Sequence, residues 1–157
     1  MQPAMREMSK AARDYCEVIE GSGLNGKDWL KRVARLLPRV HAAVAELAED
    51  MNGSGQCLDG DMEARFELFS HLRTLLGERD GYWTEYDFSR DTEAQSGSLA
   101  DDLTDIYCEL KHGLRLSEQG MEVARDSWCE GYKVHWGQHL VDAERHLYDL
   151  RVRGLLD

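Results

Sequence analysis

The chain has 157 residues, and its length and its balance of apolar and charged residues are those of one soluble globular domain. Thirty acidic residues against 19 basic ones give a formal net charge of -11, which opposes binding to nucleic-acid phosphates. No apolar run is long enough to cross a bilayer, and the N-terminal residues lack an apolar signal core. We therefore expect a cytoplasmic protein that binds neither nucleic acid nor membrane.

Apolar residues recur at helical spacing along most of the chain and predict about five helices. The first covers residues 4–20, and the second, which begins near the capping residue Asn25, carries an apolar stripe over residues 29–47. Pro38 removes one helical hydrogen bond within that stripe, so we expect a kink or a break there. A third helix is predicted over residues 61–76.

The next segment, residues 78–97, differs because four aromatic residues crowd into it before a polar run. These aromatics are Tyr82, Trp83, Tyr86 and Phe88. We predict a long loop that they pin across helix ends, with a ligand-stacking platform as the alternative. A fourth helix then begins at the N-cap Ser98, and a fifth covers residues 119–151. The fold class predicted for residues 1–157 is thus an all-α, single-domain bundle of about five helices with a long aromatic-rich loop before the fourth.

Three of the six histidines lie on the predicted fifth helix. At about 3.6 residues per turn, His135, His139, Asp142 and His146 fall on one side of it, along the border of its apolar face. Gly137 interrupts this helix, which indicates either a close approach of another group or a gap for a ligand.

Acidic residues of the fourth helix are candidates to meet these histidines. Asp102 and Glu109 lie along one border of its apolar face, whereas Asp101 and Asp105 are predicted to point away from it. If the fourth and fifth helices pack antiparallel, Asp102 and Glu109 can face the histidine stripe.

Two interpretations of this arrangement stay open. In the first, the histidines donate hydrogen bonds to Asp102, Glu109 or backbone carbonyls and form a polar seam between two helices. In the second, His135, His139 and His146 bind a divalent metal together with Asp102 and Glu109, because histidines four residues apart present their nitrogens on one side. The motif of the zinc-protease helix is absent, since Trp136 rather than Glu follows His135.

The sequence contains no motif for nucleophilic or nucleotide chemistry. No G-x-S-x-G elbow, P-loop or G-x-G-x-x-G is present, and the four cysteines form no C-x-x-C pair. Cys16, Cys108 and Cys129 fall in predicted helices as small apolar residues, and Cys57 falls in a Gly-rich loop. An enzyme is therefore not the expected class.

Two passages carry a resemblance to a known family. They are Gly-Ser-Leu-Ala-Asp-Asp-Leu-Thr-Asp-Ile-Tyr-Cys-Glu-Leu-Lys at 97–111, and the stretch from Trp128 through Tyr132 to His-Trp-Gly-Gln-His at 135–139. With Tyr82 and Trp83 before them, they resemble a bacterial family known as the domain of unknown function numbered 5063, most strongly over residues 82–147. Tyr132 stands where the family pattern has Phe. The resemblance implies a small, mainly helical domain and supplies no reaction, cofactor or site residue.

Taken together, we expect a non-enzymatic protein-interaction or adaptor module that binds another protein or a second copy of itself and needs no cofactor. Its candidate packing or interaction aromatics are Tyr82, Trp83, Trp128 and Trp136. The alternative is a helical bundle that binds a divalent metal or a small ligand through the seam between the fourth and fifth helices.

Overall fold

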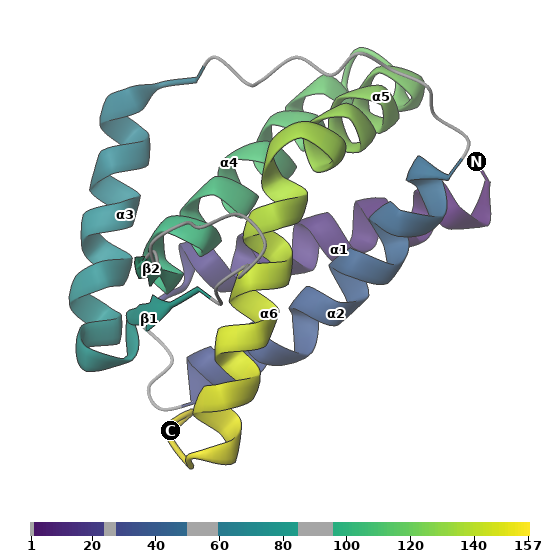
Figure 1. The fold of residues 1–157 in the computed structure, drawn as a ribbon. Helices are drawn as coiled ribbons and strands as arrows, with labels where there is room; N and C mark the ends of the chain where they lie inside the picture. Colours follow the sequence, from purple (N-terminus) through teal and green to yellow (C-terminus); the bar gives the residue numbers. More distant parts are fainter. Residues whose placement is uncertain (1, 24–27, 50–59, 85–95) are drawn as a thin grey trace, which may run out of the picture.

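The computed structural model describes residues 2–23, 28–49, 60–84 and 96–157. Its helices are α1 (Pro3–Glu20), α2 (Trp29–Ala48), α3 (Met62–Leu76), α4 (Leu99–Leu116), α5 (Met121–Gly131) and α6 (Gly137–Val152) (Figure 1). A short 3-10 turn, η2 (Gly77–Arg79), follows α3, and a π-helical segment, η3 (Tyr132–Trp136), joins α5 to α6. The prediction of an all-α fold is confirmed. Among the described residues, no helix is both long and apolar enough to span a membrane.

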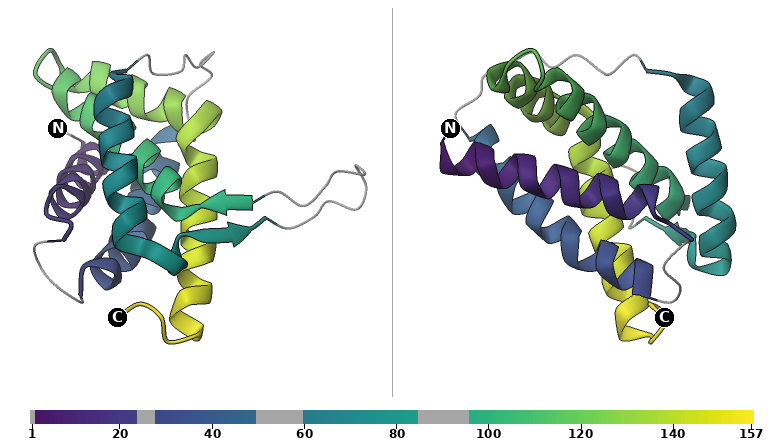
Figure 2. Two further views of the ribbon diagram at one scale, coloured as in Figure 1. Left: turned by 90° about the vertical axis from the view of Figure 1, so that its left-hand side faces the viewer. Right: turned by 180° about the vertical axis from the view of Figure 1, so that it is seen from behind.

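Helix α4 occupies the centre of the bundle and packs against α1, α3, α5 and α6. Helices α1 and α2 lie side by side, while α3 stands at the edge of the molecule (Figure 2). Buried polar groups tie the layers together: the Tyr15 hydroxyl donates to the Leu103 carbonyl at 2.8 Å, and the Trp29 indole donates to the Val18 carbonyl at 2.9 Å. The core is therefore built around α4. Because other helices surround α4, several of its polar residues are buried against them.

Of the kink or break predicted at Pro38, the break is wrong, because α2 continues through the proline. Apolar residues on both sides of the proline, such as Leu37 and Val40, are fully buried. Burial of this whole face stabilises the helix by more than one missing hydrogen bond costs. Asn25, the predicted cap, lies outside the described residues, and α2 begins after Asp28.

The helix predicted over residues 119–151 is present, since the chain is helical from Met121 to Val152, but a π-helical segment within it was not predicted. The chain changes direction at η3, so that α5 and α6 run along different axes (Figure 1). Trp136 is fully buried at this bend, and its indole donates to the Trp128 carbonyl at 3.1 Å. A Cβ at Gly137 would lie 2.3 Å from the carbonyl oxygen of Tyr132, so the bend requires glycine there. The close approach indicated by Gly137 is thus made by the Tyr132 carbonyl, five residues earlier in the same chain segment.

The two ends of the loop predicted over residues 78–97 pair as a short antiparallel ladder. Strand β1 (Gly81–Trp83) pairs with β2 (Ser96–Ser98), with Tyr82 opposite Gly97. A Cβ at Gly97 would lie 2.3 Å from the Tyr82 ring, so this glycine leaves room for the tyrosine. Sequence reasoning missed the pair because each strand has only three residues. Tyr86 and Phe88 lie outside the described residues.

The predicted N-cap of α4 is confirmed. The Ser98 hydroxyl accepts a hydrogen bond from the Asp101 amide at 3.2 Å. The buried Asp80 carboxylate accepts from the Ala100 amide at 2.7 Å and from the Ser98 hydroxyl at 2.9 Å. These bonds satisfy free amides at the start of α4 and hold β2 against it.

Candidate metal centre

Helix α4 packs antiparallel to the chain that runs from η3 into α6, and polar residues from both sides meet between them. His139 Nδ1 lies 2.7 Å from Asp102 Oδ1, and His135 Nδ1 lies 3.1 Å from Glu109 Oε1. The later histidine meets the earlier acid, as antiparallel packing requires. With Asp105, these four residues form a group that we call the His–Asp cluster.

Asp105 lies at the centre of this cluster, so the prediction that it points away from the apolar face is wrong. Its residue is only 7% exposed, and Oδ2 lies 3.0 Å from His139 Nε2 and 3.7 Å from His135 Nε2. The prediction assumed one contact face for the helix. Because α4 packs against four other helices, nearly its whole circumference is covered.

Arg65 of α3 also reaches the cluster, and sequence reasoning missed it. Its Nε donates to Asp105 Oδ1 at 2.7 Å, and a terminal nitrogen donates to Asp101 Oδ1 at 2.7 Å. This pairing fixes the Asp105 carboxylate with its other oxygen directed at the two imidazoles. No local motif indicates such a residue, because Arg65 lies 36 residues before Asp101 and 40 before Asp105 in the sequence.

Tyr82 closes the other end of the cluster and connects it to the β1–β2 pair. Its hydroxyl donates to Asp102 Oδ2, and its ring stacks on His146 with centroids 4.8 Å apart. His146 Nε2 donates to the Arg79 carbonyl at 2.6 Å. His146 therefore supports Tyr82 instead of joining the donor atoms around Asp105. The remaining stripe residue, Asp142, is partly buried and accepts a hydrogen bond from Gln138 at 3.1 Å.

Electrostatics in the cluster favours a charged His139. Burial alone would lower its pKa, but hydrogen bonds to Asp102 and Asp105 and their negative charges raise the pKa of His139 to about 10. Burial likewise opposes ionisation of Asp105, yet bonds from His139 and Arg65 lower its pKa to about 2. For Asp102 and Glu109 burial dominates, and the pKa of each carboxyl is raised.

The donor atoms have spacings that suit a metal ion. An oxygen of Asp105 and a nitrogen of each of His135 and His139 lie within 4.8 Å of one another. Two donors about 2.1 Å from a tetrahedral zinc ion would be about 3.4 Å apart, between the 3.0 and 3.7 Å observed here. The donor atoms of a second set, Asp101, Asp102 and His139, also lie within 4.8 Å of one another. The first set alone offers two imidazoles.

The local fold explains how both imidazoles reach one point. His135 belongs to η3 and His139 to the first turn of α6, with ring centroids 5.0 Å apart and planes at 81°. A Cβ at Gly131 would lie 2.8 Å from Glu109 Oε2, so this glycine leaves the space through which Glu109 reaches His135. π-Helical turns are frequent at functional sites. Here the turn carries one of the candidate ligands.

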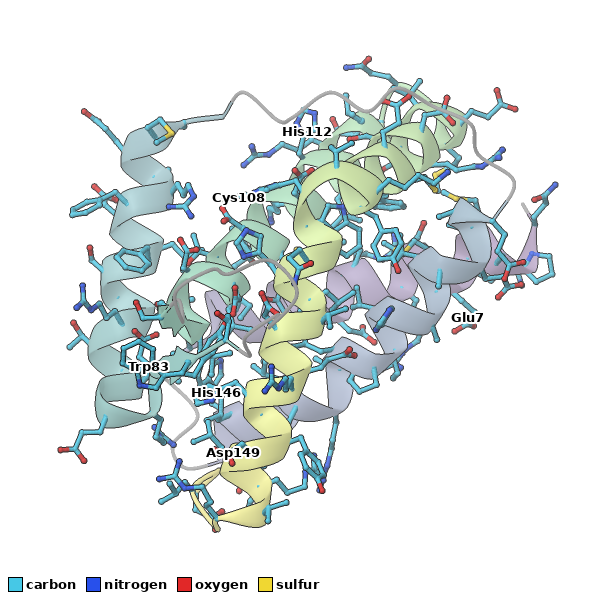
Figure 3. All side chains as sticks on the ribbon, in the orientation of Figure 1. Glu7, Trp83, Cys108, His112, His146 and Asp149 are labelled. Atoms are coloured by element: carbon cyan, nitrogen blue, oxygen red, sulfur yellow. The ribbon has the colours of Figure 1, made fainter. Side chains whose placement is uncertain are left out.

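A cleft of about 900 Å³ lies beside the cluster, between α3 and α4. Asp105, Glu109 and His135 line it. So do Cys108 and His112 of α4, which are labelled in Figure 3. One side of the candidate metal position therefore opens to a volume that would hold a small molecule.

The four candidate packing or interaction aromatics, Tyr82, Trp83, Trp128 and Trp136, differ in burial. Trp128 and Trp136 are fully buried and belong to the core, and Tyr82 is half-buried against His146. Trp83 is 72% exposed. Packing thus accounts for three of them.

Fold and cluster together define an all-α domain with a histidine–aspartate centre between its helices. The chain belongs to the family described as a domain of unknown function (DUF5063), whose model matches residues 1–153. The resemblance, most evident over residues 82–147, thus extends to the N-terminal helices. No curated protein matches the chain.

Among solved structures, the chain is similar to protein BF1032 from Bacteroides fragilis. The two chains are 22% identical, with a TM-score of 0.73 over 95% of this chain and 92% of that one. At this level of identity the likeness establishes a shared fold.

Proposed function

We propose that this domain binds one divalent transition-metal ion through Asp105, His135 and His139. The observation that carries the proposal is the convergence of a carboxylate oxygen and two imidazole Nε2 atoms on one point. Of the two interpretations drawn from the sequence, this favours the metal site. Asp105 replaces His146 as a ligand, and Asp102 and Glu109 become hydrogen-bond partners of the ligands.

The partners of the two histidines support this proposal. Histidines that bind metals usually donate their other nitrogen to a carboxylate, which fixes the ring and makes it a stronger ligand. Asp102 and Glu109 stand in that relation to His139 and His135, through Nδ1 in each case. Both carboxylates are only 3% exposed, so they also hold the imidazoles rigidly.

The charge of the cluster gives a second argument. Four carboxylates, those of Asp101, Asp102, Asp105 and Glu109, meet one arginine and two histidines. Buried carboxylates are costly without cations, and in the metal-free protein a proton on His139 supplies part of the compensation. A divalent ion at the Nε2 atoms would replace that proton and compensate more charge.

The donor set indicates which ions to expect. Imidazole and carboxylate together suit Zn²⁺, Fe²⁺ and Co²⁺, whereas Ca²⁺ and Mg²⁺ prefer oxygen ligands alone. Three protein ligands leave at least one coordination position for an outside molecule, as in catalytic but not structural zinc sites. Titration of the full-length, untagged protein with Co²⁺ tests the proposal, because coordination by nitrogen changes the visible spectrum of the ion.

A separate observation favours self-association as a second function. Val141, Tyr148 and Val152 follow one face of α6 at spacings of seven and four residues, and they are 47%, 68% and 67% exposed. Such spacing is typical of a helix that packs against a second helix. This stripe on α6 supports the expected self-association better than Trp128 or Trp136, which are buried.

A further inference from the structure

We propose that the α3–α4 cleft binds a small organic acid with an acidic group at each end, one on the metal ion and the other on His112 and Arg115. This inference rests on the proposed metal site and names the class of molecule that would occupy its open position. Three observations carry it: the cleft reaches the metal position, its lining includes the side chains of His112 and Arg115, which have no hydrogen bond or ion pair among the described residues, and apolar groups line it as well.

The cleft is continuous with the candidate metal centre. Asp105 and His135 line it, whereas His139 does not, so the outside coordination position faces the cleft on the side of Asp105 and His135. His112 and Arg115 line the same cleft, seven and ten residues beyond Asp105 on α4. At 1.5 Å per residue they lie about 10–15 Å along the helix from the metal position.

The side chains of His112 and Arg115 are available for an anion. Within residues 2–23, 28–49, 60–84 and 96–157, neither side chain has a hydrogen bond or ion pair, and Arg115 is exposed. The Arg115 charge also acts on the nearby Glu20 carboxylate. The neighbouring Lys111 is engaged, because its ammonium group donates to Glu20. A guanidinium beside an imidazole provides donors suited to a carboxylate or a phosphate.

The acids of the cleft do not oppose an anion as strongly as their number implies. All but the exposed Glu67 already accept hydrogen bonds from the protein. They are Glu20, Asp61, Asp105 and Glu109. A divalent ion at Asp105 would make that end of the cleft more positive still.

Apolar groups also line the cleft. Ile19 comes from α1, and Ala64 and Leu68 come from α3. A ligand with two acidic ends and an apolar middle would therefore find a complement to each kind of lining group, and a volume of about 900 Å³ is ample for it.

Suberate, a linear eight-carbon dicarboxylate, is the probe, and octanoate, of the same length with one carboxylate, is its matched control. Each acid is titrated into the full-length protein loaded with Co²⁺, with the visible spectrum of the ion and calorimetry as readouts. We expect suberate to change the spectrum and to bind at least about tenfold more tightly than octanoate. Arg115→Gln should remove that advantage, whereas Arg6→Gln, an exposed arginine of α1 outside the cleft, should keep it.

The outcomes separate the two proposals. Failure to take up Co²⁺ before any acid is added would overturn the metal site and this inference with it. Normal Co²⁺ uptake, with equal affinities for suberate and octanoate or with no effect of Arg115→Gln, would overturn the inference and leave the metal site standing. Equal binding of suberate to metal-free protein would likewise contradict it, because no acidic group would then need the ion.

Discussion

Arg65 Nε donates to Asp105 Oδ1 at 2.7 Å, and this bond between α3 and α4 turns the second oxygen of Asp105 toward both histidines. The side chains are 27% and 10% exposed, so the pair is largely shielded from water. Helix α3, at the edge of the bundle, thus fixes the orientation of the Asp105 carboxylate on the central helix α4.

Replacing this arginine tests its positioning role. We expect Arg65→Gln to lower the free energy of unfolding by about 1–3 kcal/mol, because it leaves a buried carboxylate without its partner. Metal affinity should fall by about ten- to a hundredfold, the usual effect of removing a group that orients a ligand. Urea unfolding and metal titration measure the two effects. Arg73→Gln, an exposed arginine on the same helix, is the control, and equal effects of both variants would contradict the assigned role.

The pKa of His139 predicts how the stability of the metal-free protein changes with pH. Its pKa is about 10 in the folded protein against 6.5 for an ordinary histidine, so the folded state binds the proton more tightly. The resulting stabilisation is complete below pH 6.5 and is lost as the pH rises toward 10. We expect a loss on the order of a few kcal/mol over that range. Urea unfolding of wild type and His139→Gln measures it, and equal slopes for both would argue against the assignment.

Glycine at position 137 should be required for the bend at η3. A Cβ there would lie 2.3 Å from a backbone oxygen, which cannot move as a flexible side chain can. Gly137→Ala should therefore destabilise the protein by about 1–3 kcal/mol, although alanine is the better helix former. Gly81→Ala is the matched control, because a Cβ at Gly81 meets nothing within 4 Å. If Gly137→Ala were as stable as wild type, the described bend would be wrong.

Self-association through α6 makes a separate prediction. Tyr148→Glu places a charge in the middle of the exposed apolar stripe and should weaken a dimer by about tenfold or more. Light scattering after size exclusion, over a range of concentrations, measures the change. Val123→Glu on α5, where the side chain is 43% exposed, introduces the same charge elsewhere and should leave the dimer intact. A wild-type protein that stays monomeric at every concentration would end this proposal.

The sequence predicted those features that depend on one helix or on one helix pair. The helix positions, the Ser98 cap and the facing of Asp102 and Glu109 toward the histidines follow from periodicity and local hydrogen bonding. The role of Asp105 could not be predicted that way, because it depends on how many neighbours surround α4. Arg65 comes from a third helix whose placement no local pattern reveals.

The bend at η3 could be predicted only in part. Gly137 signalled an unusual contact, but a helical wheel with a uniform period cannot show that five residues adopt a π-helix. His146 is separated from His139 for a simpler reason, because it lies two turns further along α6. The ladder between β1 and β2 was missed because strands of three residues carry too little alternation to detect.

The metal site itself is tested most directly by titrating untagged, full-length protein with Co²⁺ while recording the visible spectrum. Four proteins are compared: wild type, Asp105→Asn, His139→Gln and His146→Gln, each checked for helical content. We expect one equivalent of Co²⁺ to bind wild type and His146→Gln, with binding lost in the other two. A wild-type protein that takes up no Co²⁺, or uptake that Asp105→Asn and His139→Gln leave unchanged, would contradict the account.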